Sequence, residues 1–381
     1  MKKFYLKLLL SAIALLCSTI ASAHDFEVDG IFYNIIDESV KTVEVTFKGS
    51  KYDSYDSEYS GEIVVPETVE YHGYTYTVTA IGDNAFYNCG NLTSVKLPNT
   101  ILDIGNSAFG KTSIADIVIP ASVESLGDYA LARFEGLSKL EIPSNVTRIG
   151  VGAFQGWDFN NSARSLIYIG HGVQTVPDGA VAFYNGSYGR RSDVLNTVYL
   201  GSNITDINKA AFGNNTGITK VYCMASTPPA VSTSYLSYNG NNTDMYSNSD
   251  VVLYVPYGTR ESYHTASFWD NFPSIVELDY FVVDGISYRV VSETAATCEV
   301  TFDGAAYDEF TQEYVGDIVV PSSITWGGKR YTVTSVGDNA FRGCISLASI
   351  TLPPSVTSIG EYAFYDCDNL TRLFCLLPLK V

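Results

Sequence analysis

The 381-residue sequence predicts a solenoid of stacked coils, each 22 or 23 residues long, with a parallel β-sheet along one face. Three observations lead to this prediction. A short apolar motif recurs along the chain, prolines follow it at intervals of 22 and 23 residues, and residues 28–98 return as residues 283–353. Repeats of this length are typical of solenoids, because one unit cannot bury its own apolar face and must share a core with its neighbours.

The first part of each coil has the pattern Ile-Gly-x-x-Ala-Phe. It occurs at residues 81–86, 104–109 and 149–154, with a near variant at residues 126–131. We expect Gly82 to permit a tight turn, because glycine has few steric restrictions on its backbone angles. We expect the Ala-Phe pair to form an apolar wedge that points into the core from a short helix or turn.

The second part of each coil has the pattern apolar-x-x-apolar-x-apolar-Pro. It occurs at residues 92–98, 114–120 and 137–143, and the series continues without the proline at residues 195–200 and 218–223. The alternation predicts a short strand whose inward residues fill the core. Proline ends the strand because it has no N–H group to donate. Strands are therefore expected on one face of the solenoid, and short helices or turns on the other.

The longer repeat divides the chain into two modules, because residues 28–98 match residues 283–353 without a gap and about half of the positions are identical. Each module is expected to open with a β-rich cap, since solenoids need their end coils covered. The predicted parts are a cap at 24–62, a solenoid at 63–279, a second cap at 280–317 and the start of a second, incomplete solenoid at 318–381. A hairpin is expected near His72, and Trp269, Phe272 and Ile275 are expected to close the first solenoid.

The coil pattern resembles the BspA-like leucine-rich-repeat family. The resemblance is carried by Ile-Gly-Asp-Asn-Ala-Phe-x-x-Cys-x-x-Leu at residues 81–92, and by close copies at residues 336–347 and 359–370. It covers roughly residues 60–275 and 318–378. It implies a curved leucine-rich-repeat solenoid at the cell surface or outside the cell, an adhesin-like role in binding host or matrix proteins, and no shared catalytic residues. The segments 155–165, 183–193 and 231–250 depart from the pattern and are expected to be inserts.

The first 23 residues have the pattern of a signal peptide. Lys2, Lys3 and Lys7 precede an apolar run at residues 8–20, and Ala21-Ser22-Ala23 matches the small-x-small cleavage pattern, so the mature chain is expected to start at His24. The apolar run is too short for a comfortable membrane span, and no later segment is predicted to be transmembrane. Cys17 raises the alternative of a lipoprotein, although Leu16 stands where a small residue usually precedes the lipidated cysteine. Export to the cell surface, the medium or the periplasm is therefore predicted.

The charge of the chain argues against two classes of partner. The formal net charge is −18, and it becomes −21 without the three lysines of residues 1–23. Nucleic acid is not an expected partner, because its phosphates require a basic surface. The acidic charge also argues against docking of a polybasic segment on anionic lipid.

No cofactor, metal site or catalytic activity is predicted. The four histidines are scattered, and the sequence has no nucleophile elbow, phosphate loop or Cys-x-x-Cys pair. Asp53, Asp56 and Glu58 lie close together, but without the spacing of a calcium-binding EF-hand, so a solvated loop is preferred over a calcium site.

Six cysteines remain after residue 23, and they recur at core positions of the coils. Cys89, Cys344 and Cys367 follow the Ala-Phe pair, and Cys223 and Cys375 replace the last apolar residue of the strand. We expect buried free thiols, with disulfides as the alternative in an exported protein.

The strand pattern also predicts a candidate binding surface. The residue before the last apolar position of each strand should point away from the core. In four strands this residue is a tyrosine, namely Tyr168, Tyr199, Tyr222 and Tyr254, and Lys220 flanks them. Neighbouring strands lie about 4.8 Å apart, so the rings should form an exposed ladder that suits a peptide or a sugar. The alternative is that tyrosine simply suits exposed sheet positions.

Together these features predict an exported binding protein that acts through protein–protein contact. Its expected partner is an extracellular, host or matrix protein. The inserts, which are rich in Tyr, Asn and Ser, are a second candidate contact surface. Two alternatives remain, namely a glycan-binding module and a structural envelope protein without a soluble ligand.

Overall fold

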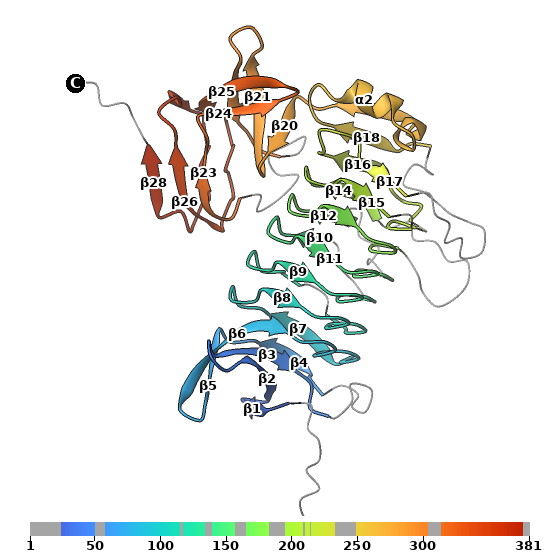
Figure 1. Ribbon diagram of the computed structural model, residues 1–381, viewed down its shortest axis with the longest axis vertical. Helices are drawn as coiled ribbons and strands as arrows, with labels where there is room; N and C mark the ends of the chain where they lie inside the picture. The colour runs from blue at the N-terminus through green and yellow to red at the C-terminus, as the bar shows by residue number, and fades with distance from the viewer. Residues whose placement is uncertain are drawn as a thin grey trace, which may run out of the picture.

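A computed structural model describes residues 24–49, 58–114, 117–133, 139–156, 165–182, 195–208, 210–213, 215–232, 249–303 and 314–375. The predicted signal peptide, Asp53, Asp56 and most of the three predicted inserts lie outside these residues. The described chain forms two modules (Figure 1), here called the first module (24–279) and the second module (280–375). Each has a hydrophobic core of its own, from Phe26 to Ile275 in the first and from Phe281 to Ala363 in the second.

The first module opens with three antiparallel strands, as expected for the cap. They are β1 (Phe26–Val28), β2 (Ile31–Asp37) and β3 (Thr42–Thr46). Strand β3 then pairs in parallel with β6 (Tyr74–Ile81), so the cap's sheet continues directly into the coils. Strands β5 (Thr68–Tyr71) and β6 form the predicted hairpin. Its two turn residues, His72 and Gly73, both have positive φ, which is the conformation that tight hairpins require.

The coils of the first module stack their strands in parallel, which confirms the predicted sheet. The long strands are β4 (Gly61–Val64), β7 (Leu92–Lys96), β10 (Lys139–Ile142), β12 (Ser165–Ile169), β14 (Leu195–Leu200), β16 (Lys220–Cys223), β18 (Val252–Val255) and β19 (Ser274–Glu277). Strands β10, β12, β14, β16, β18 and β19 form one parallel sheet, and β4 pairs with β7. Residues 117–120, where the sequence pattern predicted another strand, are not in a strand. The structure also contains short strands that the sequence pattern did not predict. They are β8 (Asp103–Ile104), β9 (Ser125–Leu126), β11 (Arg148–Ile149), β13 (Thr175–Val176), β15 (Asp206–Ile207) and β17 (Ala230–Val231). In the first three the strand ends at the apolar residue of the Ile-Gly or Leu-Gly step, and in the last three Pro177, Asn208 and Ser232 stand in place of the glycine.

The Ala-Phe wedges lie on turns, one of the two forms expected for them. Within the first turn, alternate N–H groups bond locally: Ala85 donates to the carbonyl of Gly82, at 3.2 Å. The intervening N–H groups donate to the next coil, as Phe86 does to the carbonyl of Ala108, at 2.8 Å. A continuous helix would use all of these donors internally, so the turn is the form that allows coils to bond to one another. The wedge rings then stack in the core, with 5.1 Å between the centroids of Phe86 and Phe109.

The glycine of each Ile-Gly step is required by the close approach of the coils. Gly105 and Gly127 do not have positive φ, so the turn itself does not demand glycine. A Cβ on Gly127 would lie 2.6 Å from the backbone carbon of Gly105 and 2.6 Å from the backbone nitrogen of Asn106. Gly82 has no positive φ either, and a Cβ on it would lie 2.8 Å from the carboxyl carbon of Glu44. The prediction that Gly82 serves turn formation is therefore corrected, because glycine here makes room for a close neighbour.

Acidic and amide side chains beside these glycines connect the coils further. Asp83 accepts a hydrogen bond from the backbone N–H of Asn106 at 2.7 Å, and the Asn106 side chain accepts one from Asp128 N–H at 2.8 Å. Asp128 continues the series by accepting from Val151 N–H at 2.9 Å. Each side chain thus satisfies a donor that the short strand leaves unpaired.

The predicted closing segment covers the open end of the first module. It comprises β18, α2 (Arg260–Thr265), the 3₁₀ turn η1 (Trp269–Asn271) and β19. Trp269 is fully buried, and its indole N–H donates to the carbonyl of Pro229 at 2.8 Å. Phe272 and Ile275 belong to the same core, as expected. Among the described residues, no helix is long and apolar enough to cross a membrane.

The second module repeats the start of the first at the same offset of 255 residues. Its strands are β20 (Tyr280–Val283), β21 (Ile286–Ser292), β22 (Thr297–Val300), β23 (Gly316–Val319), β24 (Ser323–Trp326), β25 (Lys329–Val336), β26 (Leu347–Leu352), β27 (Ser358–Ile359) and β28 (Arg372–Cys375). Single hydrogen bonds recur as well. Tyr59 accepts from Phe32 N–H and donates to Thr46, and Tyr314 does the same with Ser287 and Thr301.

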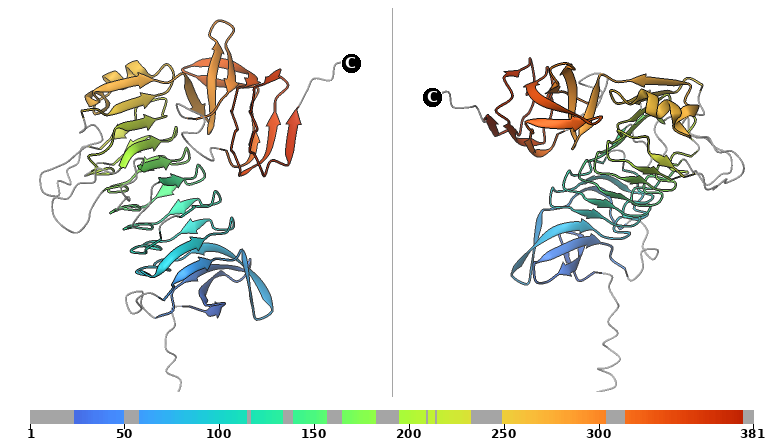
Figure 2. Two further views of the ribbon diagram at one scale, coloured as in Figure 1. Left: turned by 180° about the vertical axis from the view of Figure 1, so that it is seen from behind. Right: turned by 45° about the horizontal axis from the view of Figure 1, so that its top comes forward.

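The second module lies against the side of the first rather than extending its axis (Figures 1 and 2). Strand β20 has two buried faces. Phe281 belongs to the second module's own core, whereas Tyr280 and Val282 pack with Tyr199 and Tyr222 of the first module. Trp326 adds a hydrogen bond from its indole N–H to the carbonyl of Tyr257, at 2.8 Å.

The two caps differ at the positions that make this contact. The register of β1 with β2 and of β20 with β21 pairs Phe26 with Tyr33 and Phe281 with Tyr288, so the offset of 255 residues extends through these strands. By this offset Tyr280, Val282 and Asp303 occupy the positions of Asp25, Glu27 and Lys48. The three first-cap residues are exposed, and their three counterparts are buried. The second cap is therefore specialised for docking on the first module.

The close packing of the coils predicts the effect of adding one methyl group. Gly127→Ala should lower the free energy of unfolding by about 1–3 kcal/mol, because the new Cβ meets backbone that cannot move aside. Gly90→Ala is the matched control, since a Cβ there meets nothing within 4 Å. Its effect should stay within about 0.5 kcal/mol. Urea unfolding followed by circular dichroism measures both, and equal losses would contradict the explanation.

The cap comparison predicts how to separate the modules. Asp303→Lys restores the first-cap residue, and a buried lysine among tyrosines should expel the second cap from the first module. The radius of gyration of residues 24–381 should rise in solution scattering, while circular dichroism keeps its folded signal. Lys48→Asp makes the opposite exchange at an exposed position and should change neither. An unchanged radius in the Asp303→Lys variant would contradict the assigned contact.

Candidate functional site

The predicted tyrosine ladder exists in the structure. The registers of the parallel strands pair Tyr168 with Tyr199, Tyr199 with Tyr222, and Tyr222 with Tyr254. The rings stack in sequence, with centroid separations of 4.3, 6.1 and 4.6 Å. The coil register inferred from the sequence therefore placed these four side chains in one column.

The expectation that the ladder is exposed was wrong for three of its rings. Tyr168 is 8% exposed, and Tyr199 and Tyr222 are fully buried. They are covered by Leu278, at the end of the first module, and by Tyr280 and Val282 of the second cap. The second cap therefore occupies the surface on which a ligand was expected. The physical reason is that a column of large aromatic faces is itself an apolar docking surface.

The other two predicted residues stay at the border of this contact. Tyr254 is half-buried, and Lys220 is exposed at the start of β16. They do not form a continuous ligand platform with the three covered rings.

A buried carboxylate anchors the second cap on the ladder. Asp303 is 1% exposed and accepts hydrogen bonds from the hydroxyls of Tyr199 and Tyr280, the latter at 2.8 Å. The Nε2 atom of His171 lies 3.5 Å from the same carboxylate. Ser202 N–H donates to Nδ1 of His171 at 3.0 Å, which places the ring proton on Nε2, toward Asp303. A buried charge is tolerated when donors surround it in this way.

The hydrogen bonds of this cluster hold the second cap in place. Burial, and then the charge of Asp303, raise the pKa of Tyr199 well above its ordinary value, so its hydroxyl remains a donor. Within the described ranges, no group of three or more His, Cys, Asp or Glu residues is placed to hold a metal ion.

The six described cysteines are free thiols, and four of them are buried. Burial raises the pKa of the Cys223 thiol to about 12, which keeps it protonated and unreactive. Two cysteines depart from the expected burial, because Cys367 is half-buried and Cys375 is exposed on β28, the last strand of the described residues.

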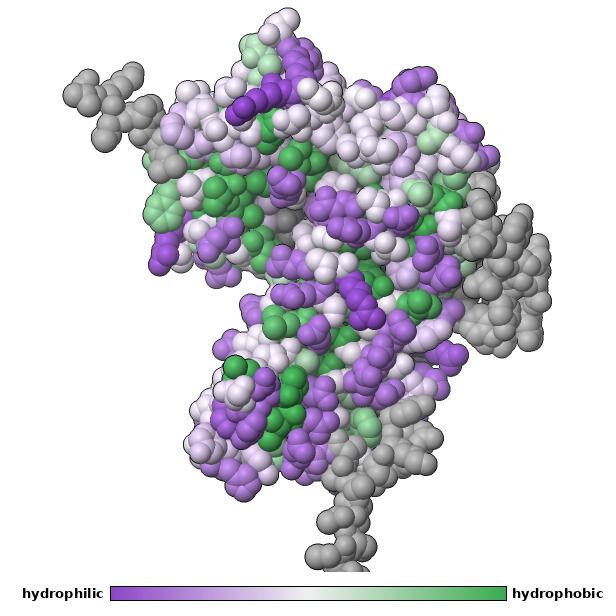
Figure 3. Space-filling view, viewed as in Figure 1, coloured by the Kyte–Doolittle hydropathy of each residue, from purple (hydrophilic) through white to green (hydrophobic). Residues whose placement is uncertain are grey.

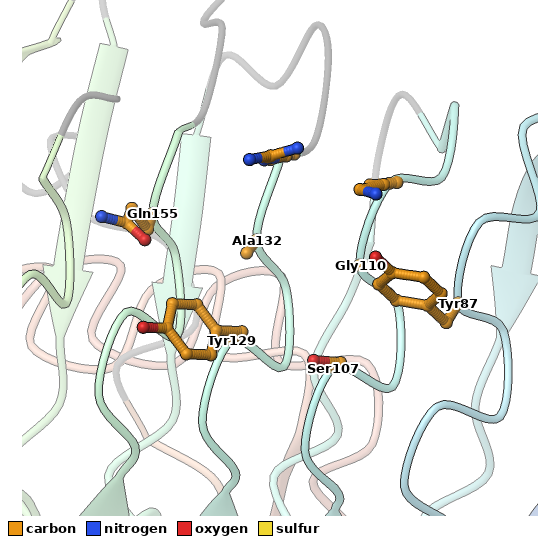
Figure 4. A pocket seen from close by; sticks show the side chains of 8 residues that line it. Tyr87, Ser107, Gly110, Tyr129, Ala132 and Gln155 are labelled. Carbon is orange, nitrogen blue, oxygen red and sulfur yellow. The ribbon is translucent and has the colours of Figure 1, made fainter. Parts of the chain in front are cut away.

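The sequence analysis missed a pocket on the turn face of the first module. It has a volume of about 220 Å³ and is lined by residues from four successive coils, with Tyr87 at one end and Gln155 at the other (Figure 4). The lining residues are Tyr87, Ser107, Gly110, Lys111, Tyr129, Ala132, Arg133 and Gln155. Small residues in the two middle coils create the hollow.

The two tyrosine rings of the pocket are seated on glycines of the next coil. A Cβ on Gly110 would lie 3.1 Å from the ring of Tyr87, and one on Gly152 would lie 2.5 Å from the ring of Tyr129. The ammonium of Lys111 lies 5.0 Å from the centroid of the Tyr87 ring, within the range of a cation–π interaction. The rings are thus held by the coil on which they rest.

Four of the lining residues have a backbone conformation that their side chains disfavour. Ser107, Lys111, Tyr129 and Arg133 have φ values of 52°, 59°, 55° and 62°. At the corresponding positions, other coils carry residues that tolerate this conformation, namely Asn84, Asn88, Gly152, Gly156 and Gly179. An alignment of the first module's coils would have shown Lys, Tyr and Arg at positions where the coils at 81–88, 149–156 and 176–179 hold Asn or Gly, and this is the signal that could have revealed the pocket.

Figure 3 shows the molecule indented between the second module and the N-terminal coils. The predicted contact surfaces at the inserts lie largely outside the described residues, because 157–164, 183–194 and 233–248 are not described.

Comparison with known proteins identifies the coils. A family model for the BspA type leucine rich repeat region matches six copies, at residues 67–188 and 322–376. The structure continues the same parallel stacking beyond residue 188, through β14, β16 and β18. No curated protein matches the chain.

Three solved structures are similar to the chain. A leucine-rich repeat protein from Bacteroides ovatus has 21% identity over 92% of this chain and 94% of its own, with a TM-score of 0.32. A leucine rich cell surface protein from Faecalibacterium prausnitzii has 20% identity over 92% and 76%, with a TM-score of 0.32. The pneumococcal vaccine antigen PcpA has 14% identity over 92% and 69%, with a TM-score of 0.33. The family match therefore identifies residues 67–188 and 322–376 as BspA type leucine rich repeats.

Proposed function

We propose that this protein is exported and acts at the cell surface or outside the cell as a binding protein, through contact with another protein. The signal-peptide pattern of residues 1–23 supports export. The repeat architecture supports binding, since solenoids present extended surfaces to their partners. The proposal assigns no catalytic activity to the chain.

The observation that carries this proposal is the backbone strain at the pocket. A left-handed conformation costs about 1–2 kcal/mol for residues such as Lys, Tyr and Arg. Neighbouring coils reach the same conformation with Asn88 or Gly156, so stacking does not require the side chains of Lys111 and Arg133. Strain of this kind is concentrated at functional sites, because selection there favours the side chain over stability. The exposed cations are therefore explained by a partner outside the chain.

The proposal predicts opposite effects on stability and on binding. In the variant Lys111→Asn/Arg133→Asn, each site receives a residue that tolerates positive φ. The free energy of unfolding should rise by up to about 1 kcal/mol for each site. Binding of residues 24–381 to arrayed extracellular-matrix proteins should be lost in the same variant. Urea unfolding and the array measure the two effects.

The outcomes of the array discriminate among the possible functions. A wild-type protein that binds no arrayed protein, although it is folded, would overturn the proposal. Binding to arrayed glycans alone would favour glycan recognition instead. A double variant that keeps its protein partner would place the contact elsewhere on the chain.

A further inference from the structure

The pocket is a cationic site on an acidic protein. The chain has a formal net charge of −18, and among the described residues that line the pocket none has an acidic side chain. Lys111 and Arg133 lie on adjacent coils, both are exposed, and both extend from the same turn position. An anionic group that approaches the molecule is repelled by most of its surface and attracted here.

The remaining lining groups suit a peptide. Tyr129 is 44% exposed, so one face of its ring is available to an apolar or aromatic side chain, and Ser107 and Gln155 offer hydrogen-bond partners. These groups follow the solenoid axis across four coils, which is a span of about 14 Å at the usual strand spacing. About four residues of extended peptide cover that length. A line of alternating apolar, cationic and amide groups therefore matches an extended chain.

The second module carries a related cluster on its own turn face. Arg342 occupies the position of Tyr87 in the repeat, and its guanidinium lies 5.6 Å from the ring of Tyr362 and 5.1 Å from that of Tyr365. Tyr362 has the same coil position as Tyr129 and the same positive φ, 55°. A cation beside a strained tyrosine thus occurs on the turn face of both modules.

We infer that the pocket formed by Tyr87, Lys111, Tyr129 and Arg133 binds an acidic, extended peptide segment of a protein partner. Lys111 and Arg133 hold its carboxylates, and the Tyr129 ring contacts an adjacent apolar side chain. This inference rests on the proposed protein-binding function and names the chemical class of the segment that is recognised. It assigns no role to the tyrosine ladder, which the second cap covers.

The test uses a labelled acetyl pentapeptide, Glu-Glu-Phe-Glu-Glu, titrated into residues 24–381 and followed by fluorescence anisotropy. The wild type should bind, and added salt should weaken binding because the charges are exposed. Lys111→Gln/Arg133→Gln should raise the dissociation constant about tenfold or more, since two charge-assisted contacts are lost. This variant keeps the left-handed backbone, so its stability should stay unchanged.

The control variant is Lys96→Gln/Lys220→Gln, which removes the same two charges from exposed positions on the strand face. It should bind the peptide as the wild type does. Gln-Gln-Phe-Gln-Gln should bind at least about tenfold more weakly than the acidic peptide if carboxylates are recognised.

Each contrary result has a distinct meaning. No binding of the acidic peptide to the wild type, or equal binding by the pocket variant, would overturn the inference. Preference for an acidic oligosaccharide such as oligogalacturonate over the peptide would overturn it as well. In all three cases the proposed protein-binding function would still stand if the array gives a protein partner, so the two proposals can fail separately.

Discussion

The whole molecule depends on how closely one coil lies on the next. Strand spacing in a parallel sheet is about 4.8 Å, and the turns must keep the same spacing if every coil is to remain stacked. Glycine at the Ile-Gly step allows the backbones to approach, and alternate turn N–H groups bond to the following coil. Asp83, Asn106 and Asp128 satisfy the donors between these bonds. At Gly105, Gly127 and Gly150, a Cβ would meet the backbone of the preceding coil, so a larger residue there would push the two coils apart.

This fixed spacing turns residues that are far apart in sequence into columns. Tyr168, Tyr199, Tyr222 and Tyr254 form one such column, because their strands pair in register. A column of aromatic rings presents a large apolar surface, and three rings of this column are buried in a cluster that includes Tyr280 and Val282 of the second cap. The second cap has Tyr280, Val282 and Asp303 where the first cap has Asp25, Glu27 and Lys48. These three replacements are buried against the first module and distinguish the second cap from the first.

On the turn face of the same coils, some of the aligned positions carry exposed side chains. Its backbone includes left-handed positions in every coil from Asn84 to Gly179, and Asn or Gly fills them in most coils. Two coils instead carry a cation there, and one carries a tyrosine, although each residue adds strain. The scaffold tolerates this strain because coil-to-coil hydrogen bonds fix the backbone independently of the side chain.

The sequence by itself determined the coil length, the parallel strands, the two caps and the column of tyrosines. These features follow from local periodicity, because a core must be filled at each repeat and strands must pair in register. The tertiary structure alone decided which surfaces are covered. The burial of Tyr199 depends on Asp303, more than one hundred residues away in sequence, and the hollow beside Tyr129 depends on small residues in neighbouring coils. Neither feature can be recognised from the repeat pattern of the sequence. The contact of Tyr199 with Asp303 occurs once, where two distant segments meet, and the hollow occurs once, where two coils depart from the repeat.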